Sequence, residues 1–233
     1  MTFSNRAEAG RRLTEQLRGW QSDPTVVVAL APRGVPLGAD VANALGTPLD
    51  AVLVHELTAP GCPPGALGAV GEDGVTELNH YLAGRLGVRP EQVEQEARRA
   101  ITLTTGLQRS LRELVPEQRV TGRTVILVDD GVATGAGASV AITILRKRGA
   151  SRLVLAVPVG ARSALERLRP LVDAVVCVRE MPWPRPVAEW YEDYPEVTDH
   201  QARWLLRRAT RHGAHEALPR HEHAHGLSRG ALV

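Results

Sequence analysis

The most informative part of this 233-residue chain is Thr124-Val125-Ile126-Leu127-Val128-Asp129-Asp130-Gly131-Val132-Ala133-Thr134-Gly135-Ala136-Gly137. Residues 125–128 form an apolar run that has the length and composition of a strand buried on both faces. Two carboxylates and several small residues follow, and residues 136–148 then have the pattern of a helix that ends at Gly149. The segment therefore predicts a buried strand, a turn rich in small residues and a helix.

A turn of this composition between a strand and a helix suits a phosphate group. In open α/β sheets, ligands bind beyond the carboxyl ends of the strands. A helix N-terminus offers free N–H groups and a positive dipole to a phosphate, and small residues let the phosphate approach the backbone. Asp129 and Asp130 would lie further out, where carboxylates accept hydrogen bonds from sugar hydroxyls or help to hold Mg²⁺. Phosphate and diol recognition together indicate a ribose 5-phosphate.

Two commoner phosphate-binding motifs do not fit these residues. A Walker loop requires a lysine, and this turn contains none. A dinucleotide fingerprint could start at Gly135, but its third small position is Val140 and two acids separate the strand from the glycines. The purely structural alternative is that the aspartates cap the helix and the glycines form a tight turn.

The rest of the sequence alternates segments of strand and helix type. We expect strands at residues 25–30, 49–54, 152–159 and 174–178, and helices at residues 5–20, 36–45, 163–168 and 198–209. In the last of these helices we expect Trp204 and Leu205 to point inward. Dense proline and glycine predict a loop at 58–79 that could include one hairpin, and the helical pattern at 90–114 is weak enough in its middle for a kink or two pieces. The alternation predicts an α/β fold with an open, mainly parallel central sheet flanked by helices.

The composition restricts the class of function. The 28 basic and 26 acidic residues nearly balance, which favours small ligands over nucleic acid. We find no apolar run long enough to span a membrane and no secretory signal at the start, and two cysteines are too few for a disulfide framework. We therefore expect a cytoplasmic protein without membrane partners. Lys147 is the only lysine, which argues against Schiff-base chemistry.

The end of the chain differs in composition from the rest. Residues 209–233 contain five of the eight histidines among glycine, arginine and glutamate. Such a segment could capture a metal ion, but its low apolar content indicates a disordered extension. We expect one domain at residues 1–208 and a disordered His-rich tail at 209–233.

Residues 125–136 resemble the phosphoribosyl-pyrophosphate (PRPP) signature of the type I phosphoribosyltransferases. The resemblance extends to residues 6–13, 33–36, 68–70 and 190–191, and covers roughly residues 3–208. It implies a five-stranded parallel core with a small hood, a homodimer, and a PRPP substrate bound with Mg²⁺. A small nitrogenous acceptor, a base or a related compound, would displace pyrophosphate at the anomeric carbon.

The resemblance also implies roles for individual residues. Asp129 and Asp130 would be the catalytic pair that holds the ribose hydroxyls and, partly through the substrate, Mg²⁺. The expected contacts to the 5-phosphate come from Gly131, Ala133, Thr134, Gly135, Ala136 and Gly137. Arg33 and Gly34 would lie at the pyrophosphate. Trp190 and Tyr191 would either line the acceptor pocket or pin the C-terminal segment to the sheet.

Three places depart from the family pattern. The loop at 33–35 has one glycine after its arginine instead of two, Glu56 stands where relatives have a cation, and Gly137 replaces a threonine. These departures favour a second hypothesis, in which the domain binds PRPP or a nucleotide without catalysis and regulates a partner. A third, a nucleic-acid regulator, would need a basic face, and acids alternate with the candidates Arg98, Arg99, Arg109 and Arg112.

Overall fold

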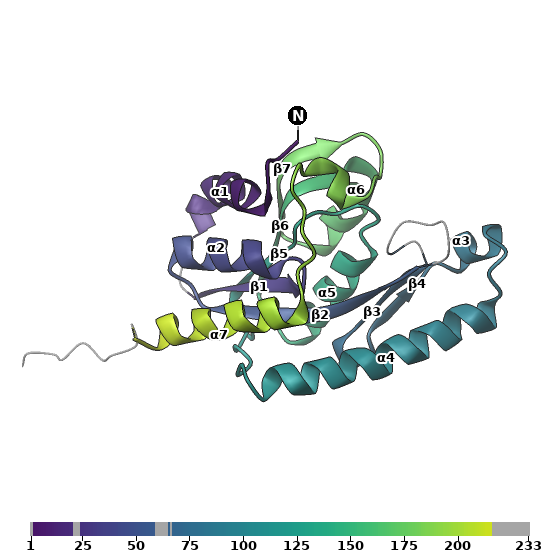
Figure 1. Cartoon of the computed structure of the whole chain (residues 1–233), viewed down its shortest axis with the longest axis horizontal. Coiled ribbons are helices and arrows are strands. Elements are labelled where there is room, and N and C mark those ends of the chain that lie inside the picture. The colour runs from purple at the N-terminus through teal and green to yellow at the C-terminus, as the bar shows by residue number, and fades with distance from the viewer. Residues whose placement is uncertain (1, 21–23, 59–64, 66, 216–233) are drawn as a thin grey trace, which may run out of the picture.

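The computed structural model describes residues 2–20, 24–58, 65 and 67–215. Their centre is a seven-stranded sheet with the order β4-β3-β2-β1-β5-β6-β7 (Figure 1). The strands are β1 (Thr25–Ala31), β2 (Leu49–Leu57), β3 (Gly68–Gly71), β4 (Thr76–Leu78), β5 (Thr124–Val128), β6 (Arg152–Ala161) and β7 (Ala174–Met181). The five strands β2, β1, β5, β6 and β7 are parallel, which confirms the expected core.

Strand β1 lies in the middle of the sheet because both of its faces are apolar. All seven of its residues are buried, and alternate side chains point to opposite layers. Val27 and Ala29 pack under the layer that contains α1 (Arg6–Leu17), α2 (Val35–Leu45) and α7 (Asp199–His215). Val26 and Val28 face α5 (Ala136–Lys147) and α6 (Arg162–Leu168) on the other side. Both faces of β1 are therefore covered by helices.

A smaller unit, which we call the hood, lies on the side of the sheet beyond β2 (Figure 1). It consists of the antiparallel strands β3 and β4, which an η2 turn (Glu72–Gly74) connects, together with α3 (His80–Arg85) and α4 (Pro90–Arg112). A separate apolar cluster, which includes Val70, Val93 and Ala97, holds these elements together. The segment expected to be loop thus contains the hairpin that the sequence allowed.

Helix α4 is one continuous helix of 23 residues, and not a kinked or divided one. Its buried residues, Val93, Ala97, Ala100, Thr104 and Leu111, follow helical spacing along one face. The threonines do not interrupt it, since Thr102 and Thr105 donate their hydroxyls to carbonyls one turn earlier. Packing on the hood and the sheet therefore outweighs the low helix propensity of its middle.

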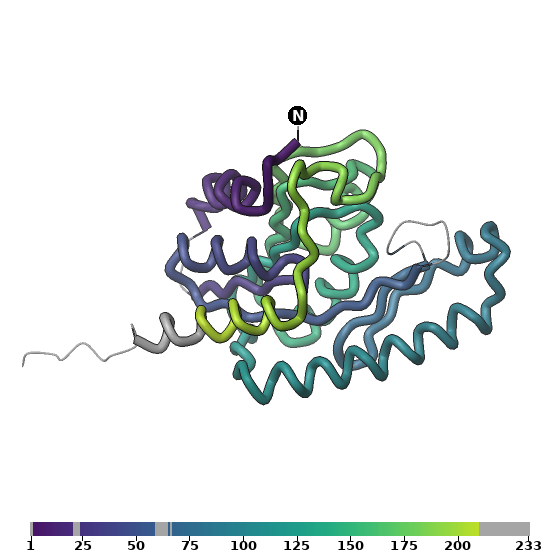
Figure 2. Tube along the Cα trace, in the orientation of Figure 1, coloured from purple at the N-terminus to yellow at the C-terminus, as the bar shows by residue number. Residues whose placement is uncertain are grey.

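The two ends of the domain meet on one side of the sheet. Phe3 pairs with Tyr191 as an isolated parallel bridge, and Phe3 N–H donates to the carbonyl of Trp190 at 2.8 Å. Figure 2 shows the segment between β7 and α7 descending along this side before α7 begins. Short η4 (Val187–Trp190) lies within that segment, while η1 (Arg18–Trp20) follows α1 and η3 (Arg169–Leu171) follows α6.

The C-terminal helix differs from expectation in two respects. It continues to His215, beyond residue 209 where the tail was expected to begin, and residues 216–233 of that tail lie outside the described part of the chain. The Trp204 side chain was expected to point inward but is 54% exposed, whereas Ala202 and Leu206 provide the buried face. Within the described residues, no helix is long and apolar enough to cross a membrane.

Candidate functional site

The structure brings together the loops that follow β1 and β5. These strands are adjacent and parallel, so their carboxyl ends open on the same edge of the sheet. A Cβ atom on Gly34 would lie 2.6 Å from the carbonyl oxygen of Val128 and 3.0 Å from the Cα of Asp129. Only glycine allows this approach, which places the Arg33–Gly34 turn directly beside the two aspartates.

The 131–137 loop runs alongside β6, and its last two residues are the first two of α5. Val132 N–H donates to the carbonyl of Val159 at 2.9 Å, and Ala161 N–H donates to the carbonyl of Val132 at 2.8 Å. A side chain at Gly131 would collide with Val159 and Val187, since its Cβ would lie 2.8 Å and 2.7 Å from their methyl carbons. The loop is therefore fixed in position by β6 on one side and by the C-terminal segment on the other.

The loop presents the N-terminus of α5 to this edge of the sheet. Gly135 adopts a left-handed conformation with φ of 84° and carries no side chain that could cap the helix. Ser139 N–H donates to the carbonyl of Gly135 at 2.9 Å, so the N–H groups of residues 136–138 come before the first intrahelical bond. Arg167 also holds the loop, through a hydrogen bond to the carbonyl of Thr134 at 2.6 Å. Such a helix end is a ready site for an anion.

Asp129 and Asp130 lie side by side and are almost inaccessible. Their exposed fractions are 5% and 1%, and the backbone N–H of Asp130 donates to Oδ1 of Asp129 at 2.8 Å. Burial raises the pKa of the Asp129 carboxyl well above its ordinary value, and the negative charge of Asp130 raises it further. The pair is thus a closely spaced dyad whose two carboxylates differ in their partners.

Asp130 is held by side chains from both ends of the domain. Its Oδ2 atom accepts a hydrogen bond from Arg6 Nε at 3.0 Å and another from the Tyr194 hydroxyl at 2.8 Å. The Tyr191 hydroxyl donates to its backbone carbonyl at 2.6 Å. The contacts of Arg6 and Tyr194 with Asp130 were not predicted, because 124 and 64 residues separate them from Asp130 and no local pattern links them.

Arg6 is a buried cation that contacts both Asp130 and the segment before α7. Its Nη1 donates to the carbonyl of Pro195 at 2.6 Å, and its guanidinium carbon lies 3.8 Å from the centre of the Tyr194 ring. Its positive charge compensates the negative charge of the buried Asp130 carboxylate. The start of α1 and the segment before α7 are therefore joined at the dyad.

Trp190 and Tyr191 were predicted either to line an acceptor pocket or to pin the C-terminal segment. The Tyr191 ring is 6% exposed and contacts the rings of Phe3 and Tyr194 at centroid distances of 5.6 Å and 5.0 Å. Burial raises the pKa of the Tyr191 hydroxyl, and the nearby charge of Asp130 raises it further. Trp190 packs partly buried against the same core. These contacts favour the pinning role.

Arg33 and Glu56 form an ion pair next to the 131–137 loop. Nη2 of Arg33 lies 2.5 Å from Oε2 of Glu56. Burial alone would lower the pKa of Arg33, but the carboxylates of Glu56, Asp129 and Asp130 together raise it. A Cβ atom on Gly137 would lie 3.4 Å from Oε1 of Glu56, so this carboxylate stands beside the N-terminus of α5. Two departures from the family pattern are thus neighbours in space.

The residues present would suit a magnesium ion that is held mainly by other groups. Mg²⁺ in proteins commonly takes one or two carboxylates and completes its shell with water and substrate oxygens. Oδ2 of Asp130 already has two donors, which leaves Asp129 as the better protein ligand. The described residues contain no group of three side chains from His, Cys, Asp and Glu that could hold a metal by themselves.

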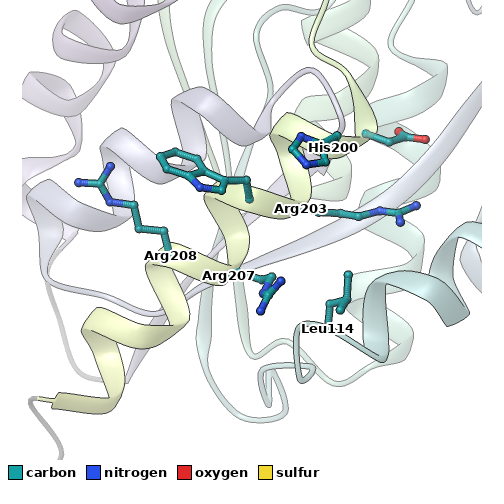
Figure 3. Close-up of a pocket in the computed structure, with 7 residues that line it drawn as sticks. Leu114, His200, Arg203, Arg207 and Arg208 are labelled. Carbon is teal, nitrogen blue, oxygen red and sulfur yellow. The ribbon is translucent and has the colours of Figure 1, made fainter.

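An open groove of about 740 Å³ lies away from these residues, between α7 and the end of α4 (Figure 3). Arg203 and Arg207 extend from α7 into it, and Leu114 faces them (Figure 3). None of the predicted site residues lines it. The candidate site is thus defined by the strand ends and the 131–137 loop.

Comparison with known proteins gives the family. The chain is 37% identical to TT1426 from Thermus thermophilus, whose crystal structure it matches with a TM-score of 0.71 over 89% of this chain and 99% of that one. It is 36% identical over 217 residues to "Putative phosphoribosyl transferase Rv0571c" of Mycobacterium tuberculosis, which is 90% of this chain and 47% of that protein. The chain belongs to the type I phosphoribosyltransferase family.

A more distant relative matches part of this chain in sequence. The "Ribose-phosphate pyrophosphokinase" of Pyrococcus furiosus is 30% identical over 125 residues, 46% of this chain and 45% of that protein. No family model matches the chain. The chain spans about half the length of the mycobacterial relative.

Proposed function

We propose that this domain transfers the ribose 5-phosphate group of PRPP to a nitrogen acceptor and releases pyrophosphate. The observation that carries the proposal is the position of the buried Asp129–Asp130 dyad beside the N-terminus of α5, with Arg33 at the same strand edge. This arrangement offers separate recognition elements for a phosphate, a sugar and a second anionic group. Family membership supports the same reaction.

The 131–137 loop would bind the 5-phosphate through backbone N–H groups. The dipole of α5 favours a negative charge at this end, and the twelve-residue length of the helix is sufficient for that effect. Gly131 is needed because the side chains of Val159 and Val187 leave no room for a Cβ atom there. Gly135 is needed because its positive φ disfavours any other residue. The loop would therefore fix one end of the substrate with little rearrangement of the backbone.

The dyad would bind the ribose and stabilise the charge that develops on it. As the bond between C1 and the pyrophosphate oxygen breaks, its electron pair leaves with pyrophosphate and C1 becomes positive; the acceptor nitrogen then supplies the pair for the new C1–N bond. Asp129 lies where a carboxylate could accept hydrogen bonds from sugar hydroxyls, while Arg6 and Tyr194 keep Asp130 in place. No covalent nucleophile from the protein is required.

Arg33 would stabilise the departing pyrophosphate. It is a permanent cation at the end of β1, and the glycine after it brings its backbone against β5. A bound Mg²⁺ would supply additional neutralisation of the phosphate charges. Arg33 must leave Glu56 for this task, because the two side chains form an ion pair in the structure.

That pairing also supports a second candidate function, a non-catalytic regulator that binds PRPP or a nucleotide. Glu56 brings a negative charge to the place where an anion is expected to bind. A pyrophosphate-release assay with PRPP, Mg²⁺ and a panel of nucleobases distinguishes the two. Release with any base that depends on Asp129 supports the transferase, whereas PRPP binding without release across the panel supports the regulator.

A further inference from the structure

The Arg33–Glu56 ion pair lies where the proposed substrate would bind, and the inference below rests on the proposed function. Glu56 belongs to β2, whose carboxyl end opens on the same edge of the sheet as those of β1 and β5. Its side chain is 21% exposed and that of Arg33 is 38% exposed, so the pair lies at the surface of the site.

Glu56 directs a carboxylate oxygen toward the N-terminus of α5. A Cβ atom on Gly137 would lie 3.4 Å from its Oε1, and a Cβ atom on Gly65 would lie 3.1 Å from the same oxygen. The same Cβ atom on Gly65 would lie 2.7 Å from Oγ1 of Thr134. The absence of side chains at residues 65 and 137 therefore leaves space for the Glu56 carboxylate. The positive end of a helix attracts a carboxylate for the same reason that it attracts a phosphate.

Arg33 connects this carboxylate to the dyad. Its Nη2 lies 2.5 Å from Oε2 of Glu56, and its charge interacts with Asp129 and Asp130 on the other side. The site thus contains an anion near the N-terminus of α5 and a cation near the two aspartates. The proposed substrate would place its 5-phosphate at the helix N-terminus, near this carboxylate.

We propose that Glu56 is an internal competitor for the phosphate of the ligand and thereby sets the affinity of the site. Binding of a phosphorylated sugar displaces the Glu56 carboxylate from the N-terminus of α5 and frees Arg33 from its ion pair with Glu56. The competitor raises the concentration of phosphorylated ligand that the site requires. The Glu56 carboxylate competes only with ligands that place an anionic group at the N-terminus of α5.

Calorimetric binding of ribose 5-phosphate tests the proposal. Glu56→Gln removes the competing charge and keeps the size of the side chain, so we expect ribose 5-phosphate to bind about tenfold more tightly or better, since like charges in contact are strongly unfavourable. Glu94→Gln removes the same charge from an exposed Arg–Glu pair on α4 and should leave the affinity within about twofold of wild type. Glu56→Ala should change the affinity in the same direction as Glu56→Gln.

Each outcome separates this inference from the proposed function. Tighter binding by both Glu56 variants, or binding by them alone, supports the internal competitor. Equal or weaker binding by the Glu56 variants, with wild type binding ribose 5-phosphate, overturns the competitor and leaves the proposed function standing. Failure of wild type and variants to bind either ribose 5-phosphate or PRPP would overturn both.

Discussion

Arg6 Nε donates a 3.0 Å hydrogen bond to Oδ2 of Asp130, although 124 residues separate them in the chain. Arg6 starts α1, and Asp130 follows the strand β5. The same oxygen accepts a hydrogen bond from Tyr194, in the segment before α7. The dyad therefore depends on three parts of the chain, and its geometry is a product of the whole fold.

Removal of Arg6 should destabilise the protein strongly. Arg6→Met leaves the carboxylate of Asp130 buried without its cation, and we expect the free energy of unfolding in urea to fall by about 3 kcal/mol or more. Arg12→Met is the matched control on the same helix, because Arg12 forms a partly exposed i,i+4 pair with Glu8 that should be worth about 1 kcal/mol or less. Equal losses in the two variants would show that Arg6 contributes little through Asp130.

Glycine at position 34 should be required for folding of the site. The Cβ atom of Gly34→Ala would meet the carbonyl of Val128 at 2.6 Å, so β1 and β5 would have to shift apart, with a loss of about 2 kcal/mol or more. Gly106→Ala is the control in α4, where the added carbon would have no described atom within 4 Å apart from its chain neighbours and the adjacent backbone of the helix. It should stabilise by about 0.5–1 kcal/mol. Urea denaturation of both variants measures the difference, and a neutral Gly34→Ala would contradict the close approach.

The Asp129 carboxyl should make stability fall as the pH rises. Its pKa is raised in the folded protein, so above pH of about 4 the unfolded chain loses this proton while the folded protein retains it. The contribution is fully present below the ordinary pKa and is lost as the pH rises through the folded-state pKa. Asp129→Asn should therefore be more stable than wild type at neutral pH, by a margin that narrows toward pH of about 4. Urea denaturation across this range would contradict the assignment if the margin were constant.

The hood should depend on the buried pair Glu72–Arg148. Glu72 accepts hydrogen bonds from Leu53 N–H at 2.7 Å, from Gln108 at 3.0 Å and from Arg148 at 2.5 Å, which links β2, α4 and the end of α5. Arg148→Met should lower the free energy of unfolding by about 3 kcal/mol, because Glu72 stays buried without its cation. Arg98→Met, at an exposed pair on α4, should cost less than about 0.5 kcal/mol. Similar losses in urea would show that burial of Glu72 does not matter.

Local patterns were sufficient to predict the parallel core and the position of the 131–137 loop. Strands β1 and β5 are apolar throughout because both of their faces are covered, and this signal is present in each segment alone. The 58–79 segment was harder, since β3 and β4 are only four and three residues long and depend on pairing with β2. Helix α4 also depends on contacts that are distant in sequence, because its apolar face packs on the other elements of the hood.

The partners of the dyad could not be predicted from local patterns. Arg6 and Tyr194 are ordinary polar residues in their own segments, and only tertiary structure brings them to Asp130. The sequence comparison singled out Glu56 as a departure, but its contact with Arg33 follows from the parallel alignment of β1 and β2. The prediction for Trp204 was wrong for a different reason. Its apolar character alone predicted an inward side chain, but this residue is half exposed.

Binding of PRPP in the presence of Mg²⁺, measured by calorimetry on wild type, Asp129→Asn and the exposed control Asp193→Asn, tests the central claim most directly. We predict that wild type and Asp193→Asn bind PRPP equally and that Asp129→Asn, although stable at neutral pH, loses more than about tenfold in affinity, since each tenfold corresponds to about 1.4 kcal/mol of lost contacts to the sugar. Absence of PRPP binding by wild type, or equal binding by Asp129→Asn, would contradict the claim that this dyad recognises the ribose of PRPP.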